Sequence, residues 1–212
     1  MAESVKMILV MAVFSGLAGL GLAAMDRQTA PLIAKNNRLF TLKSINVVMP
    51  ETDKPDPCKK FEPGFDNEPD KDIVCINGTT VYRGRNNGKI TGIAVKSIGD
   101  NAFSGTITVL VGLRMSDGML TGLKVLLHAE TPGLGTNMTK CAFQQQMVGH
   151  TPSDIKWSVA KDGGDIDQLS GATITSRSML SAITKAQKIW SEHKDEIINA
   201  EALKQGGTCD GN

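Results

Sequence analysis

The chain has 212 residues, a formal net charge of +1 and 21% charged residues. This balance excludes the strongly basic field that attracts nucleic acid, and an aromatic content of 4% argues against a surface that stacks bases. We therefore expect no nucleic-acid partner.

The first predicted element is an apolar segment over residues 7–25, which follows a short tail at 1–6. No charged side chain lies between Lys6 and Asp26. A helix of this length reaches about 28 Å, close to the hydrocarbon thickness of a bilayer. A removed signal sequence and a buried core helix are the alternatives. Because the apolar core of a signal sequence usually runs only about 7–15 residues, we expect a retained transmembrane helix.

Two features give opposite indications of the side of the membrane on which the rest of the chain lies. Four basic residues lie between positions 27 and 43, against Lys6 alone on the short side, and the positive-inside rule then favours a cytoplasmic domain. Cys58 and Cys75 flank an acidic, proline-rich loop and could close it as a disulfide, which requires an oxidising compartment. Unpaired thiols are the alternative.

The region 26–72 predicts a lead-in and a surface loop. Residues 26–48 have a mixed helical or extended pattern, and residues 49–72 hold five of the eight prolines, which is typical of a loop. The roughly 185 residues that follow the apolar segment are enough for one compact domain with its own core. We place that domain at 73–204 and a flexible Gly-rich tail at 205–212.

The domain itself predicts an α+β fold, a mostly antiparallel sheet with packed helices. Short β-branched and apolar runs predict strands at 73–76, 79–82, 90–95, 106–114 and 120–128. The turn Ser116-Asp117-Gly118 joins the last two as a hairpin. Apolar residues at helical spacing predict helices over 139–148 and 176–202.

A first motif, Asp167-x-x-Ser170-Gly171-Ala172-Thr173, lies directly before the second predicted helix. It sets the Thr173 hydroxyl where backbone N–H groups and a helix dipole converge, which is a natural seat for a phosphate. The alternative is an ordinary helix cap, which Ser170, Thr173, Thr175 or Ser176 could supply.

A second motif runs from His128 to Gly135 and reads His-Ala-Glu-Thr-Pro-Gly-Leu-Gly. Its glycines, Gly133 and Gly135, allow the backbone to lie against a planar ligand. Glu130 and Thr131 can hydrogen-bond the ligand or fix the loop, and Leu134 offers an apolar contact. A plain strand-to-helix turn is the alternative. His-x-Glu also opens a zinc deaminase signature, but the Pro-Cys-x-x-Cys that completes it is absent, so we expect no metal site.

Together the two motifs resemble the FMN-binding domain family, over most of residues 75–190. The resemblance implies that FMN is joined to Thr173 through a phosphoester. It implies that Asp167 belongs to the sequence recognised by a separate flavin transferase that uses FAD and Mg²⁺. The residues expected around the flavin are Ser170, Gly171, Ala172, Thr175, Glu130, Thr131, Gly133, Leu134 and Gly135. The chain departs from the family at 101–105, where a Gly-Tyr-Gly-Gly-like stretch is often found.

Within that family, the chain is most similar to the G subunits of Rnf-type complexes, ferredoxin:NAD⁺ oxidoreductases coupled to ion transport. The resemblance implies an electron carrier without catalytic residues, held in the inner membrane among other membrane subunits, with its FMN domain on the extracytoplasmic side. The alternatives are a C subunit of a Na⁺-translocating NADH:quinone reductase, which is generally longer, and a free-standing, membrane-tethered flavin reductase. A non-redox sensor or adhesion module would require the Thr173 motif to be only a helix cap.

Overall fold

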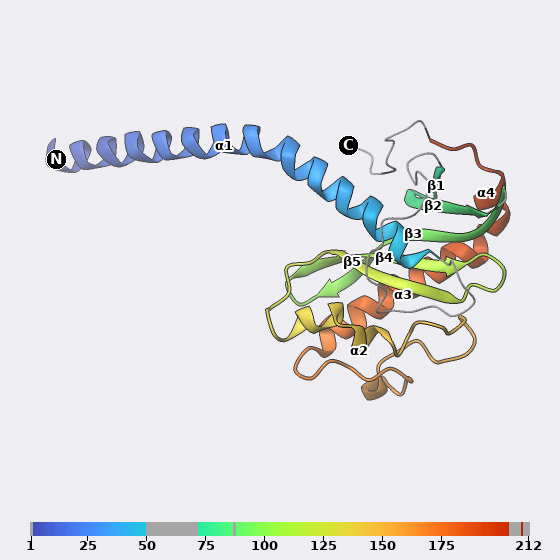
Figure 1. The fold of residues 1–212 in the computed structure, drawn as a ribbon. Helices are drawn as coiled ribbons and strands as arrows, with labels where there is room; N and C mark the ends of the chain where they lie inside the picture. The colour runs from blue at the N-terminus through green and yellow to red at the C-terminus, as the bar shows by residue number, and fades with distance from the viewer. Residues whose placement is uncertain (1, 50–71, 87, 204–208, 210–212) are drawn as a thin grey trace. The chain divides into compact units, whose positions relative to one another are not determined.

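The computed structural model describes residues 2–49, 72–86, 88–203 and 209. The chain divides into two compact units, Met1–Phe40 and Thr41–Asn212. The first unit is helical, and the second contains the sheet and the remaining helices. Figure 1 shows the order of these elements along the chain.

Helix α1 (Ala2–Val48) contains the predicted membrane segment. Within the described residues it is the one helix long and apolar enough to cross a bilayer, and the apolar side chains of that stretch are not buried by the protein. The helix continues past Pro31 to Val48, so the predicted lead-in at 26–48 is helical throughout. Of the predicted loop at 49–72, residues 50–71 lie outside the described residues.

The sheet is an antiparallel meander, β1-β2-β3-β4-β5, in which each strand pairs with its neighbour in sequence (Figure 1). Its order confirms the predicted α+β class. The strands are β1 (Ile73–Ile76), β2 (Thr79–Asn86), β3 (Lys89–Ala102), β4 (Gly105–Arg114) and β5 (Leu120–Leu127).

Strands β2 and β3 are longer than predicted. The glycines inside them resemble turn residues, so the sequence pattern predicts strand ends too early. Gly84 and Gly99 both lie at register shifts of the ladder, where the strand continues past an irregularity. At Gly99, a Cβ atom would lie 2.3 Å from the backbone oxygen of Ser178. The glycine therefore allows the helix that carries Ser178 to pack closely on the sheet.

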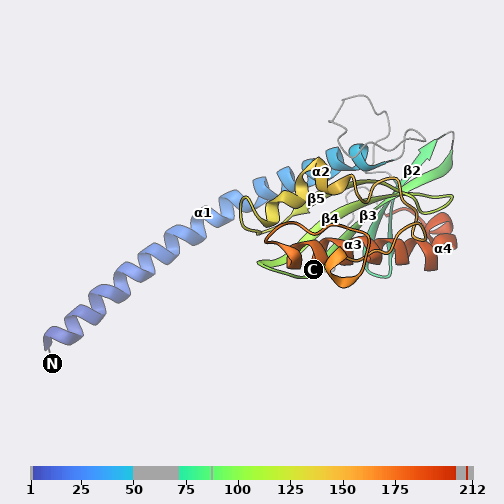
Figure 2. The ribbon, with the colours of Figure 1, turned by 90° about the horizontal axis from the view of Figure 1, so that it is seen from below.

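That helix is α3 (Thr173–Glu192), which lies along one face of the sheet and is followed by α4 (Lys194–Asn199) (Figure 2). Its buried apolar stripe joins the main core with side chains of β3 and β4. The single predicted helix over 176–202 is therefore wrong in two respects. The helix begins three residues earlier, and it breaks at His193, where φ is −119° and ψ is 24°.

The predicted helix over 139–148 is also wrong. A 3₁₀ helix, η2 (Gly135–Thr139), is followed by one turn of α-helix, α2 (Cys141–Gln144), and then by turns. Met138, Phe143 and Met147 nevertheless pack into the core. Their spacing resembles that of an amphipathic helix, although successive turns place them. A second short 3₁₀ helix, η3 (Ala160–Asp162), lies before α3.

The opposite face of the sheet is covered by the last residues of α1, which belong to the same unit. Ile45 and Val48 are buried against Ala94 and Leu110 of the sheet. The Thr121 hydroxyl donates a hydrogen bond of 2.6 Å to the carbonyl oxygen of Val48. Both faces are therefore buried, which explains why β4 has an almost unbroken run of apolar residues.

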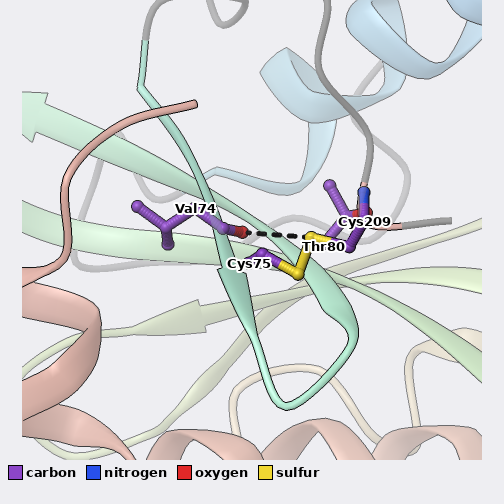
Figure 3. Close-up of a disulfide and its surroundings, with 4 residues drawn as sticks. All are labelled: Val74, Cys75, Thr80 and Cys209. Atoms are coloured by element: carbon purple, nitrogen blue, oxygen red, sulfur yellow. Dashed lines mark hydrogen bonds between the residues drawn. A yellow bond between two sulfur atoms is a disulfide. The ribbon is translucent and has the colours of Figure 1, made fainter. Parts of the chain in front are cut away.

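A disulfide joins Cys75 of β1 to Cys209 (Figure 3). A cysteine forms one disulfide, so the predicted pairing of Cys58 with Cys75 is wrong; Cys58 lies outside the described residues. Sequence spacing cannot give disulfide connectivity, and here the partner lies 134 residues away. The Leu203 N–H also donates to the Ile73 carbonyl at 2.7 Å, so Leu203 as well as Cys209 is joined to the edge strand.

The predicted turn between β4 and β5 is held by Asp117. Arg114 donates two hydrogen bonds to its carboxylate, at 2.9 and 2.6 Å, and the Met119 N–H donates a third at 3.1 Å. Hydrogen bonding by Arg114 is the largest cause of the lowering of the Asp117 pKa, from 3.8 to about 2.

We expect Arg114→Gln to raise the pKa of Asp117 toward 3.8, as measured by NMR titration of the carboxyl carbon. Because the folded-state pKa is depressed, the carboxylate contributes stability above its unfolded pKa, and this contribution is lost as the pH falls through about 2. The Asp162 carboxylate, paired with Arg177 elsewhere on the domain, is the control and should titrate unchanged. An Asp117 pKa that stays near 2 in the variant would assign the shift to another group.

Candidate functional site

Three segments of the domain meet around a cavity of about 330 Å³, a volume at the lower end for ligand pockets. They are the turn between β3 and β4, the loop after β5, and the first turn of α3. The cavity thus brings together the two motifs singled out in the sequence. Its lining residues are Phe103, Glu130, Thr131, Leu134, Gly135, Gly171, Ala172, Thr173, Ile174 and Thr175.

Thr173 is the first residue of α3, and the residue before it, Ala172, makes no side-chain cap hydrogen bond. The first N–H groups of a helix have no acceptor within the helix. In the part of the chain that the structure describes, no backbone acceptor is found for the N–H groups of Thr173, Ile174 and Thr175. The positive end of the helix dipole therefore lies open at the cavity.

The other hydroxyl groups of this turn are engaged inside the protein. Thr175 donates to a Glu130 carboxylate oxygen at 2.7 Å, and Ser176 donates to the Ala172 carbonyl at 3.1 Å. Both are buried, whereas Thr173 is half-buried. The cap position of α3 is held by Ala172, without a side-chain cap hydrogen bond. The alternative that Ser170, Thr173, Thr175 or Ser176 caps the helix is therefore wrong, and Thr173 is the reachable hydroxyl of the first turn.

Gly171 has the geometry that the open approach to Thr173 requires. Its φ of +70° favours glycine, and a Cβ atom there would lie 3.2 Å from Leu134 Cδ2. A larger residue would strain the backbone and press against the side chain that lines the opposite wall. Ser170 is exposed and does not line the cavity.

The Glu130 carboxylate is buried between the walls of the cavity. One oxygen accepts the Ser104 N–H at 3.1 Å, and the other accepts the Thr175 hydroxyl. A Cβ atom on Gly135 would lie 2.4 Å from the second oxygen, so only glycine allows this approach. Of the two roles expected for Glu130, contact with a ligand or fixing of the loop, these bonds describe the second.

The loop after β5 is stabilised by its own side chains. Thr136 Oγ1 accepts the Gly133 N–H at 2.9 Å, and Asn137 donates to the Gly133 carbonyl at 2.7 Å. Gly133 itself has a φ of +79° and does not line the cavity, whereas Thr131 and Leu134 do. The loop thus presents Leu134, which is 46% exposed, as an apolar surface.

Asp167 lies outside the cavity on the protein surface. Its backbone is fixed by Gln146, whose side-chain oxygen accepts the Asp167 N–H at 2.7 Å. The residue is exposed. It is therefore reachable by a second protein without obstruction from the cavity walls.

Sequence reasoning missed Phe103 and Ile174 as lining residues. Phe103 is 70% exposed at the turn between β3 and β4, and Ile174 is 46% exposed. Together with Leu134 they form an apolar rim, a name we keep for these three residues. The available signal was the departure from the family pattern at 101–105, the stretch that contains Phe103.

The comparisons with known proteins agree with this geometry. The FMN-binding domain family matches residues 102–188, a range that contains both motifs and every residue that lines the cavity. The G subunit of the ion-translocating oxidoreductase complex of Shewanella piezotolerans is 35% identical over 151 residues, which cover 65% of this chain and 71% of that relative. The chain belongs to this family of G subunits.

A second family member, from Aliivibrio fischeri strain MJ11, is 37% identical over 123 residues, covering 56% of this chain. The match spans 58% of that relative, less than two thirds of its length. Among solved structures, the crystal structure of Shewanella oneidensis NqrC aligns with a TM-score of 0.44 and 23% identity, covering 56% of this chain and 60% of that one. The chain thus has an FMN-binding domain that follows a candidate membrane helix.

Proposed function

We propose that this chain is the electron-transfer subunit of an Rnf-type, ion-translocating ferredoxin:NAD⁺ oxidoreductase complex. It carries electrons on FMN joined to Thr173 through a phosphoester. The observation that carries the proposal is the cavity, in which the accessible Thr173 hydroxyl and the open helix N-terminus lie opposite the second motif. Membership of the family of G subunits supports it.

The residues that line the cavity fit FMN. The free N–H groups at the start of α3 and the helix dipole would hold the phosphate, with each favourable contact contributing up to about 1 kcal/mol. The apolar rim would contact the ring system of the flavin. When bound, FMN supplies the redox chemistry, and the protein provides binding, orientation and partial exclusion of water.

Attachment requires a second protein. An alcohol attacks a phosphate at neutral pH only when a base removes its proton, and no His or Lys adjoins Thr173 in sequence. A flavin transferase with FAD and Mg²⁺ would meet this need. The Thr173 oxygen bonds to the flavin-side phosphorus, the pyrophosphate bond breaks and AMP leaves, while a base of the transferase takes the proton. The exposed Asp167 and Ser170 are available for recognition.

The location that we propose is the inner membrane, with α1 as a single span among the other subunits and the FMN domain on the extracytoplasmic side. The Cys75–Cys209 disulfide supports this side, because disulfides persist in oxidising compartments. Cys141 is disulfide-bonded as well. These bonds outweigh the basic residues after the span, since a domain of this length is translocated largely regardless of its charge.

The intact mass of the chain tests the proposal directly. When the chain is produced with a flavin transferase, we expect its mass to rise by the mass of FMN less one water, and no rise without the transferase. The flavin should remain fluorescent on the denatured protein in a gel. An unchanged mass in both preparations would refute covalent attachment.

A further inference from the structure

Glu130 connects two walls of the cavity, the turn between β3 and β4 and the first turn of α3. The residue is only 6% exposed, and in the described part of the chain its carboxylate forms no ion pair. Burying an unpaired carboxylate is costly unless hydrogen bonds satisfy it. Both of its oxygens are satisfied, one by the Ser104 N–H and the other by the Thr175 hydroxyl.

The two donors belong to the segments that carry the proposed flavin contacts. Ser104 follows Phe103 in the turn between β3 and β4, and Thr175 lies two residues after Thr173 in the first turn of α3. Phe103 is the most exposed side chain of the apolar rim. Its place beside the cavity therefore depends on how its turn is held.

We infer that Glu130 is a positioning residue that sets the distance between Phe103 and the first turn of α3, and so controls how closely Phe103 lies against the flavin ring. The inference rests on the proposed function for the identity of the ligand. The carboxylate acts through the turn and the helix that it connects. Phe103 is the contact that it places.

Two substitutions of Glu130 separate hydrogen bonding from charge. Glu130→Gln keeps an oxygen that can accept the Ser104 N–H and adds an amide that can donate to the Thr175 hydroxyl oxygen. Glu130→Ala removes both connections. If Glu130 works by positioning, the glutamine variant should behave like the wild type and the alanine variant should not.

The first readout needs no flavin. In the full chain made without transferase, hydrogen exchange of the Ser104 amide should be about tenfold faster in Glu130→Ala than in the wild type, and unchanged in Glu130→Gln. Thr175→Val removes only one of the two connections and replaces the alanine variant if that variant does not fold. It should also accelerate exchange of the Ser104 amide. Unchanged exchange in both Glu130→Ala and Thr175→Val would overturn the inference.

The second readout is the flavin itself, in the full chain loaded by the transferase. Glu130→Ala should increase flavin fluorescence and reduce its visible circular dichroism, because an aromatic side chain no longer lies against the ring. In a Phe103→Ala background, Glu130→Ala should change neither signal further. A further change of equal size in that background would show that Glu130 acts on the flavin by another route and would overturn the inference.

Arg83→Met is the matched control for lost stability. Arg83 is as buried as Glu130, and it donates to the carbonyls of Ile197 and Ala200, away from the cavity. The variant should unfold at lower denaturant concentration while both flavin signals stay as in the wild type. A wild-type chain without flavin would refute the proposed function, and amide exchange alone would then decide whether Glu130 holds the turn.

Discussion

Replacing Thr173 by valine should leave a protein without covalent flavin. Valine matches threonine in shape but lacks the hydroxyl, so α3 should start at the same residue. The other hydroxyls of the first turn of α3 cannot replace it, because Thr175 and Ser176 are buried and hydrogen-bonded. Intact mass and in-gel fluorescence after production with the transferase should both show complete loss of the flavin.

The controls for this variant are two other hydroxyl changes. Thr173→Ser keeps an attacking oxygen and should restore attachment at least in part, and Ser191→Ala removes an exposed hydroxyl of α3 that lies outside both the cavity and the Thr173 motif and should retain the full flavin mass. Flavin on the valine variant, or its loss from the Ser191→Ala variant alone, would assign the attachment to a different residue.

The order of strands could be predicted from the sequence because the sheet is a meander of neighbours. Ile73–Ile76 was predicted to the residue, and the Ser116-Asp117-Gly118 turn was placed correctly. The ends of β3 were missed, because Gly99 lies in a strand to let α3 approach, and this reason exists only in the tertiary structure. Local patterns thus gave the elements, and packing between elements gave their boundaries.

The candidate site shows the same division. The Thr173 and Glu130 motifs were predicted as parts of one site, and the structure brings both to one cavity. Their separate roles could not be predicted, since the Glu130 partners are a backbone N–H and a hydroxyl from segments distant in sequence. Phe103 was missed because an exposed aromatic in a turn has no periodic pattern to identify it.

Removing the Cys75–Cys209 disulfide should lower the free energy of unfolding by about 2–4 kcal/mol. The bond closes a loop with a sequence separation of 134 residues, and long loops lose the most entropy when the unfolded chain is cross-linked. It also ties the C-terminal segment to β1, a four-residue strand at the edge of the sheet. Urea unfolding of the double variant Cys75→Ser, Cys209→Ser under non-reducing conditions measures the change.

The flavin should remain on that double variant, because neither cysteine is among the residues that line the cavity. Hydrogen bonds from Leu203 to Ile73 and from Arg83 to Ala200 still hold the C-terminal segment, so a destabilised but folded domain is expected. Peptide mapping of the wild type without reductant should recover Cys75 linked to Cys209. A peptide that links Cys75 to Cys58, or an unfolding midpoint equal to that of the wild type, would contradict this connectivity and its role in stability.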